Sequence, residues 1–123
     1  VNVLKTKANV KLIAIADAFA DRAEQSLKGV QGQFRDEAQR RQKIDVPPER
    51  IFVGLDCHEK ALACAPDLVL LCSPPGFRPA HFEAAVKAGK HVFLEKPVAT
   101  DAPGVRRILA ANAEAKKKSL SVQ

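Results

Sequence analysis

Residues 68–94 read LVLLCSPPGFRPAHFEAAVKAGKHVFL, and this stretch predicts a strand, a helix and a second strand. Leu68 to Cys72 is a continuous apolar run, as expected for a strand that is buried on both faces. Pro79 suits the first turn of a helix, and Gly89 suits the position just beyond its end. His91 to Leu94 then forms a strand that a right-handed crossover makes parallel to the first.

The same alternation of strands and helices extends to both sides of this stretch. Val10 to Ala16 (VKLIAIA) predicts a strand, Ile51 to Val53 predicts a shorter one, and Ser119 to Val122 begins another. Between the first two, apolar residues recur every three or four positions over residues 19–38 and predict one helical face with a break at its glycines. The residues of that face are Phe19, Ala23, Leu27, Val30, Phe34 and Ala38, and the glycines are Gly29 and Gly32.

Two further helices have recognisable first turns. Asp56 followed by Glu59 predicts a capping box that opens a helix through Cys64. Thr100 or Asp101 is expected to cap the last helix, which has a proline in its first turn. The inner stripe predicted for that last helix consists of Val105, Ile108, Leu109 and Asn112.

Alternating strands and helices predict an α/β fold, with an open, doubly wound parallel sheet and helices on both faces. A chain of 123 residues is long enough for one compact domain. Its 46% hydrophobic and 28% charged residues exclude a disordered class. No apolar run approaches the roughly 20 residues of a membrane span.

The charge pattern argues against a nucleic-acid partner. The net charge of +6 comes from basic runs that acidic residues separate, and no Tyr or Trp lies among them. Such runs are typical of solvated helix ends. The cysteines, seven and eight residues apart, fit neither a metal pair nor a disulfide framework, and Cys72 is interpreted as a small buried hydrophobe. No metal site is expected, because no pair of the three histidines has helical spacing.

Ligands of open parallel sheets bind at the carboxyl ends of the strands, so the residues after each strand are site candidates. Asp17 follows the first strand, where a carboxylate either accepts hydrogen bonds from a ribose diol or caps the next helix. Residues 73–79 form a rigid turn that either faces a flat ligand or simply connects strand to helix.

Glu95-Lys96-Pro97 follows the His91–Leu94 strand. Lys96 there is suited to donate to a substrate oxygen or to carry a proton, with Glu95 holding its position. Pro97 makes the backbone rigid, with a possible cis peptide bond. The alternative is an ordinary surface ion pair, worth less than about 1 kcal/mol.

Together these segments resemble the dinucleotide-binding half of the Gfo/Idh/MocA oxidoreductases, the family of glucose-fructose oxidoreductase and inositol dehydrogenase. The resemblance covers nearly the whole chain, and AGKHVFLEKP (residues 88–97) is its most specific part. The other matching segments are Ala14 to Asp17, Leu70 to Pro75, His81 and Thr100-Asp101.

The resemblance implies a role for each matching position. Asp17 binds the adenosine ribose, and Lys96 lies beside the nicotinamide and the substrate and assists proton transfer. The remaining cofactor-binding positions that it implies are Ser73, Pro74, Pro75, His81, Glu95 and Pro97. Many family members have Asn where Pro75 stands, which puts a side-chain contact at that position in question. The cofactor is expected to be NAD rather than NADP, because the Asp17 carboxylate repels a 2′-phosphate.

The chain also departs from the family pattern. It has no GxGxxG turn, and residues 1–8 (VNVLKTKA) are interpreted as the end of a first helix. The resemblance therefore implies that residues 1–123 are an incomplete Rossmann-type domain, without its first strand and without the C-terminal substrate domain. A missing first strand would leave a gap between the Val10–Ala16 and Leu68–Cys72 strands.

The function implied is hydride transfer between NAD and a sugar, cyclitol or related polyol. The substrate would also contact the second domain, and the isolated chain is expected to be inactive. A homo-oligomer is expected for the whole protein, with no nucleic-acid or membrane partner. The cytoplasm is the favoured location, with export left open. The alternative function is a non-catalytic nucleotide-binding or assembly module.

Overall fold

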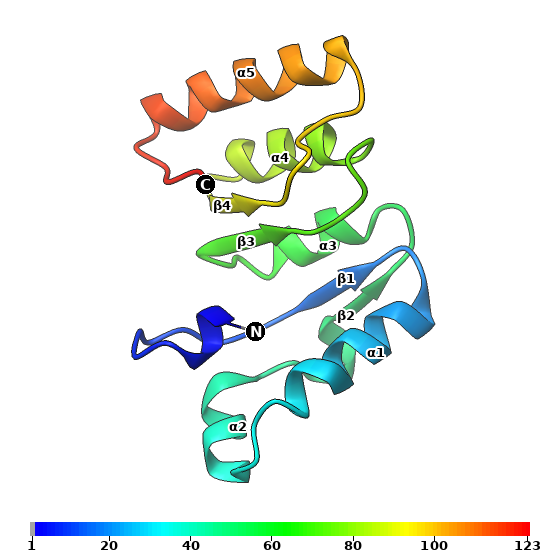
Figure 1. The fold of residues 1–123 in the computed structure, drawn as a ribbon, viewed down its shortest axis with the longest axis vertical. Coiled ribbons are helices and arrows are strands. Elements are labelled where there is room, and N and C mark those ends of the chain that lie inside the picture. Colours follow the sequence, from blue (N-terminus) through cyan, green and yellow to red (C-terminus); the bar gives the residue numbers. More distant parts are fainter. Residues whose placement is uncertain (1) are drawn as a thin grey trace. The chain divides into compact units, whose positions relative to one another are not determined.

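The computed structural model describes residues 2–123 and divides into two compact units that meet in sequence between Cys64 and Ala65. In each unit, two short parallel strands form a sheet with helices packed beside it (Figure 1). The fold is α/β and of the Rossmann type, as the sequence predicts. None of the described helices is long and apolar enough to cross a membrane.

The first unit is built on strands β1 (Ile15–Asp17) and β2 (Ile51–Val53), which pair in parallel so that Asp17 lies opposite Val53. Helix α1 (Ala20–Gln31) packs on both strands and buries Ala23 and Leu27. The other helices of this unit are α2 (Glu37–Lys43) and α3 (Cys57–Ala63), with 3₁₀ turns at Asn2–Lys5 and Pro48–Arg50.

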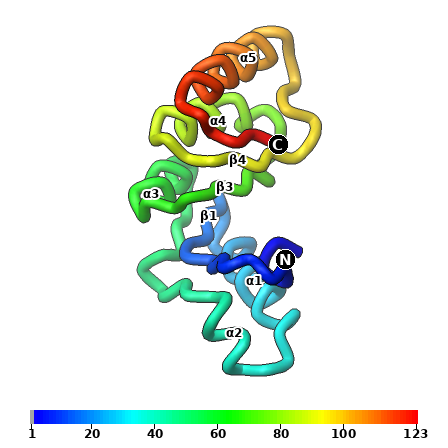
Figure 2. The backbone as a smooth tube through the Cα atoms, turned by 90° about the vertical axis from the view of Figure 1, so that its left-hand side faces the viewer, coloured from blue at the N-terminus to red at the C-terminus, as the bar shows by residue number. Residues whose placement is uncertain are grey.

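The second unit is built on β3 (Leu68–Leu71) and β4 (His91–Leu94), which are parallel and in register from Leu68 opposite His91 to Leu71 opposite Leu94. Helix α4 (Arg78–Lys87) packs on this sheet, and α5 (Ala102–Lys117) packs on α4 (Figure 2). Both helices thus lie on the same side of the sheet. The largest fully buried side chains of this unit are Phe82, Val86 and Val92.

Several element ends are as predicted. Gly89 follows α4 with a φ of +71°, a conformation that glycine adopts without steric strain. Asp101 caps α5 by accepting a hydrogen bond from the backbone N–H of Gly104 (2.7 Å). After α5, Val122 makes a parallel bridge to Val92, where the sequence predicts the beginning of a further strand.

The strand predicted over residues 10–16 is too long. Regular pairing begins at Ile15, and the earlier part makes only an isolated bridge from Leu12 to Ile44. The partner segment contains Pro47 and Pro48 between this bridge and β2, and proline has no N–H to continue the ladder.

The prediction that the strand β3 is buried on both faces is also wrong. Leu68 is 41% exposed and Leu70 is 45% exposed, while Leu71 is buried. The side chains of β3 alternate between a face covered by α4 and an open face. Cys72, predicted to be buried, is exposed.

The predicted helix faces need three corrections. The segment over residues 19–38 divides into α1 and α2 near Gly32, as its glycines predict, but Phe19 and Ala38 of the predicted face are exposed. The side chain of Asp56 pairs with Lys60 (2.9 Å) and does not cap α3. On α5, Val105 and Leu109 are exposed because the helix packs closely through Ala111 and Ala115.

The described part of the segment interpreted as a first α-helix forms a 3₁₀ turn over Asn2–Lys5, and Val1 lies outside the described residues. The gap expected between the first strand and the Leu68–Cys72 strand concerns the relation between the two units and stays a prediction.

Candidate functional site

Asp17 ends β1 and combines two hydrogen bonds with an available carboxylate oxygen. Its Oδ1 accepts from the backbone N–H of Phe19 (3.0 Å), and its main-chain carbonyl accepts from the N–H of Gly54 (3.1 Å). Helix α1 begins at Ala20, after Phe19 as its cap residue, so Asp17 is not the helix cap. Within residues 2–123, Oδ2 has no hydrogen-bond partner, which leaves one oxygen to accept from a ligand.

Apolar side chains flank this carboxylate in sequence and across the ladder. Phe19 is 67% exposed, Val53 opposite Asp17 is 41% exposed, and Leu55 in the next turn is 76% exposed. A carboxylate among exposed apolar side chains suits a ligand that combines hydroxyl groups with a flat apolar ring. Phe19 and Leu55 were not predicted as site residues, because the helical periodicity assigned Phe19 to the core and no motif singled out Leu55.

Cys57 opens α3 and is the buried thiol of this unit. Burial raises the pKa of Cys57, and the Asp17 and Asp56 carboxylates raise it further. The thiol is therefore neutral near pH 7, which argues against a nucleophilic role.

In the second unit, the turn after β3 brings two of the predicted residues together. The Oγ atom of Ser73 lies 3.1 Å from Nδ1 of His81 on α4, within hydrogen-bond distance. The ring of Phe77 stacks on His81, with centroids 6.2 Å apart and planes inclined by 17°. The carbonyl of Pro74 accepts from the N–H of Phe77 (3.0 Å) and closes the turn.

The Glu95-Lys96-Pro97 turn follows β4, and its Lys96–Pro97 peptide bond is cis, as the sequence suggested. The carboxylate of Glu95 accepts from the backbone N–H of Lys96 (3.0 Å) and so holds the main chain of that residue. Among the described residues, the exposed Lys96 ammonium makes no ion pair. The surface ion pair considered from the sequence is therefore not formed.

Arg78, the first residue of α4, is a feature of this turn that was not predicted. The side chain is only 6% exposed, and its Nη1 donates to the carbonyl of Glu95 (2.8 Å) and to the carbonyl of Pro97. The N–H of Glu95 in turn donates to the carbonyl of Leu71 (3.1 Å), at the end of β3. The sequence signal that could have singled out Arg78 is its place at a helix N-terminus, where the helix dipole makes a cation unfavourable.

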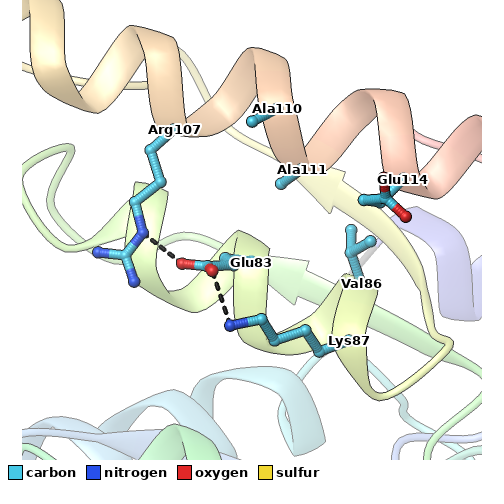
Figure 3. A pocket seen from close by; sticks show the side chains of 7 residues that line it. All are labelled: Glu83, Val86, Lys87, Arg107, Ala110, Ala111 and Glu114. Carbon is cyan, nitrogen blue, oxygen red and sulfur yellow. Dashed lines mark hydrogen bonds and ion pairs between the residues drawn. The ribbon is translucent and has the colours of Figure 1, made fainter.

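A hollow of about 210 Å³ between α4 and α5 contains none of the predicted site residues (Figure 3). At its edge, the carboxylate of Glu83 accepts hydrogen bonds from Lys87 and Arg107, and these bonds lower the pKa of Glu83. The Nζ of Lys118 donates to the carbonyls of Val86 and Lys87 at the end of α4. The Arg107 and Lys118 contacts join α5 and the residue after it to α4, while the Lys87 contact lies within α4.

The predicted residues thus fall into two groups, one in each unit. The first unit holds Asp17. In the second unit, a backbone hydrogen bond and the Arg78 side chain connect the turn after β3 to the turn after β4. No group of three or more potential metal ligands exists among residues 2–123. The remaining predicted residues, Pro74 and Pro75, lie in the turn between β3 and α4.

Comparison with known proteins gives a consistent result. The model of the Gfo/Idh/MocA oxidoreductase family, described by its NAD-binding Rossmann fold, matches residues 1–123. An inositol 2-dehydrogenase of Pseudomonas savastanoi pv. phaseolicola is 34% identical over 123 residues, which cover 96% of this chain and 30% of that protein. An inositol 2-dehydrogenase of Cereibacter sphaeroides is 35% identical over 104 residues, which cover 85% of this chain and 25% of that protein.

Solved structures share the fold at lower identity. An NAD-binding oxidoreductase from Klebsiella pneumoniae has a TM-score of 0.62 at 21% identity, over 91% of this chain and 24% of that one. A dehydrogenase from Bordetella pertussis, solved with NADH and UDP-GlcNAcA, has a TM-score of 0.57 at 22% identity, over 92% of this chain and 27% of that one. The chain spans about a third or less of each of these four proteins.

Proposed function

The chain belongs to the Gfo/Idh/MocA oxidoreductase family, and from that premise we propose that it is the nucleotide-binding part of an NAD-dependent polyol dehydrogenase. The substrate is a sugar, a cyclitol or a related polyol, and the reaction interconverts an alcohol and a ketone. The inositol 2-dehydrogenases among the relatives make a cyclitol the first substrate to test.

The observation that carries this proposal is the environment of Asp17. Its Oδ1 is held by the N–H of Phe19, while Oδ2 remains available to accept from the hydroxyl groups of the adenosine ribose. The exposed ring of Phe19 offers an apolar surface beside the carboxylate. These residues fit an adenine nucleoside, in which a diol and a flat ring are adjacent.

The same carboxylate favours NAD over NADP. A 2′-phosphate placed against Asp17 would meet a like charge, and the next two residues, Ala18 and Phe19, supply no cation to compensate for it. Desolvation of two anions that face each other is costly, so discrimination against NADP follows from charge alone.

We assign the nicotinamide end of the cofactor to the second unit, through the turn after β3 and the turn after β4. When bound, the nicotinamide ring supplies the hydride chemistry. In ketone reduction the Lys96 ammonium donates a proton to the substrate oxygen, and in alcohol oxidation the neutral Lys96 amine accepts the proton of the substrate hydroxyl. Glu95 fixes the Lys96 main chain. The other residues assigned to this end are Ser73, Pro74, Pro75, His81 and Pro97.

We also propose that substrate binding and catalysis need the whole protein, which would include a second, substrate-binding domain and assemble as a homo-oligomer. The chain of residues 1–123 alone then holds cofactor contacts without a complete substrate site. It is expected to turn over no substrate by itself.

The test is the formation of NADH by the whole protein with NAD⁺ and a panel of polyols, myo-inositol first, followed by near-ultraviolet absorbance. The proposal expects NADH that depends on one class of polyol, and none from residues 1–123 alone. NAD⁺ binding without turnover of any polyol would instead favour a non-catalytic nucleotide-binding module. Absence of both binding and turnover would contradict the family-based function.

A further inference from the structure

We propose that Arg78 is a positioning residue that fixes the Glu95-Lys96-Pro97 turn, and through it the Lys96 ammonium, for proton transfer. This inference rests on the proposed function, because it assigns to Lys96 the role given above. Arg78 itself is not placed against substrate or cofactor. It acts through the main chain on either side of Lys96.

The hydrogen bonds of Arg78 bracket Lys96. Nη1 donates to the carbonyl of Glu95, one residue before Lys96 (2.8 Å), and to the carbonyl of Pro97, one residue after it. A donor that carries a full charge makes stronger hydrogen bonds than a neutral one, and burial excludes competing water. The backbone of Lys96 is therefore held at both ends while its side chain remains exposed.

The position of this cation is costly, which argues for a role beyond packing. Arg78 is the first residue of α4, where the positive end of the helix dipole disfavours a cation, and the first turn contains no acidic residue. Within the described part of the chain, Arg78 makes no ion pair, and its buried Nε has no hydrogen-bond partner. An apolar side chain would fill the same space without these costs.

The connection also reaches the other predicted residues of this unit. Arg78 and His81 share the first turns of α4, and His81 lies 3.1 Å from the Oγ of Ser73. The backbone bond from Glu95 to Leu71 joins the same turn to the end of β3. Arg78 thus links the turn that carries Lys96 to the turn that carries Ser73.

Three variants of the whole protein test the role. Arg78→Met keeps most of the apolar stem but removes the donor, and Arg78→Lys keeps a single charged donor. Arg107→Met is the matched control, because it removes the same charge from the same unit and contacts Glu83 on α4 instead of the turn. Circular dichroism checks that each variant folds.

The expected result is a loss of kcat without a comparable loss of cofactor affinity. Arg78→Met should lower kcat about 10- to 100-fold, the effect of a small displacement of a reacting group, with the KM for NAD⁺ changed less than about threefold. Arg78→Lys should lower kcat about three- to tenfold, because the shorter lysine side chain reaches the two carbonyls less well. The control should keep the wild-type kcat.

A second readout does not need activity. In the whole protein, Arg78→Met and Arg78→Lys should shift the backbone amide NMR signals of Glu95, Lys96 and Val98, and Arg107→Met should leave them in place. Arg78 variants with a wild-type kcat and unshifted amide signals would overturn the inference. Equal losses of kcat in Arg78→Met and Arg78→Lys would overturn it too. If Arg78→Met does not fold, the same criteria apply to Arg78→Lys against the control.

The two claims can fail separately. A wild-type protein without polyol-dependent NADH formation would contradict the proposed function, while the amide signals would still report whether Arg78 holds the turn. An active wild-type protein whose Arg78 variants match Arg107→Met would contradict only the inference.

Discussion

The carboxylate of Asp17 has one oxygen engaged by the N–H of Phe19 and one available, and this division gives a prediction at the scale of a residue. Asp17→Ser removes the charge that repels a 2′-phosphate and the acceptor for the ribose hydroxyls. The preference in kcat/KM for NAD over NADP should fall by about 1–3 kcal/mol in the whole protein. Asp21→Ser, a change of the same charge on the exposed face of α1, is the control. An unchanged ratio of the two kcat/KM values in Asp17→Ser would remove Asp17 from the cofactor site.

Lys96 is predicted to act in the transition state more than in cofactor binding. Lys96→Ala should lower kcat by about 100-fold or more, the usual contribution of a group that transfers a proton. The Kd for NAD⁺, measured by calorimetry, should change little, because the proposed role places the Lys96 side chain at the reacting substrate. Lys116→Ala on the exposed end of α5 provides the control. Equal losses of kcat and affinity would make Lys96 a structural residue.

The thiols should differ in reactivity. Burial raises the pKa of Cys57, whose thiolate the Asp17 and Asp56 carboxylates also disfavour, whereas Cys72 is exposed. At about pH 8 an alkylating reagent should modify Cys72 first and Cys57 last, as mass spectrometry of the digested chain can measure. The order should persist in Asp56→Asn, because burial is the main cause of the shift. Modification of Cys57 as fast as that of Cys72 would contradict this assignment.

At the scale of elements, the contact between α4 and α5 should weaken in acid. Lys87 and Arg107 lower the pKa of Glu83 below its unfolded value of about 4.3. The ionised carboxylate therefore stabilises the fold above that value, and this contribution is lost as pH falls through the folded pKa.

Glu83→Gln should accordingly lower the Tm at pH 7 by a few degrees at most, because the pairs are partly exposed. The difference in Tm between the wild type and Glu83→Gln should shrink toward pH 3. Glu24→Gln, which removes an exposed pair within α1, is the control. A difference in Tm that grows in acid would contradict the assigned sign.

The pattern of the elements was predictable, because short apolar runs and their proline and glycine boundaries are local signals. Strand β4 and helix α4 follow this rule. The packing faces were less predictable. Helix α5 approaches α4 through Ala111 and Ala115, so the larger Val105 and Leu109 remain outside, and periodicity alone favours the larger side chains as core.

At the scale of the whole molecule, the rule that ligands bind at the carboxyl ends of parallel strands identifies the candidate turns from the sequence alone. The same rule cannot identify residues that act across long sequence separations. Arg78 contacts Glu95 and Pro97 from another element, and no local pattern encodes that contact. Phe19 lies outside the helical face because α1 begins one residue later than the periodicity indicated.

A crystal structure of the whole protein with NAD⁺ tests the central claim most directly. We expect the adenosine ribose hydroxyls to lie at about 2.7 Å from the Asp17 carboxylate, a normal hydrogen-bond length, and Lys96 to lie beside the nicotinamide ring. An adenosine ribose bound away from Asp17, or a nicotinamide ring distant from Lys96, would contradict the proposed cofactor site.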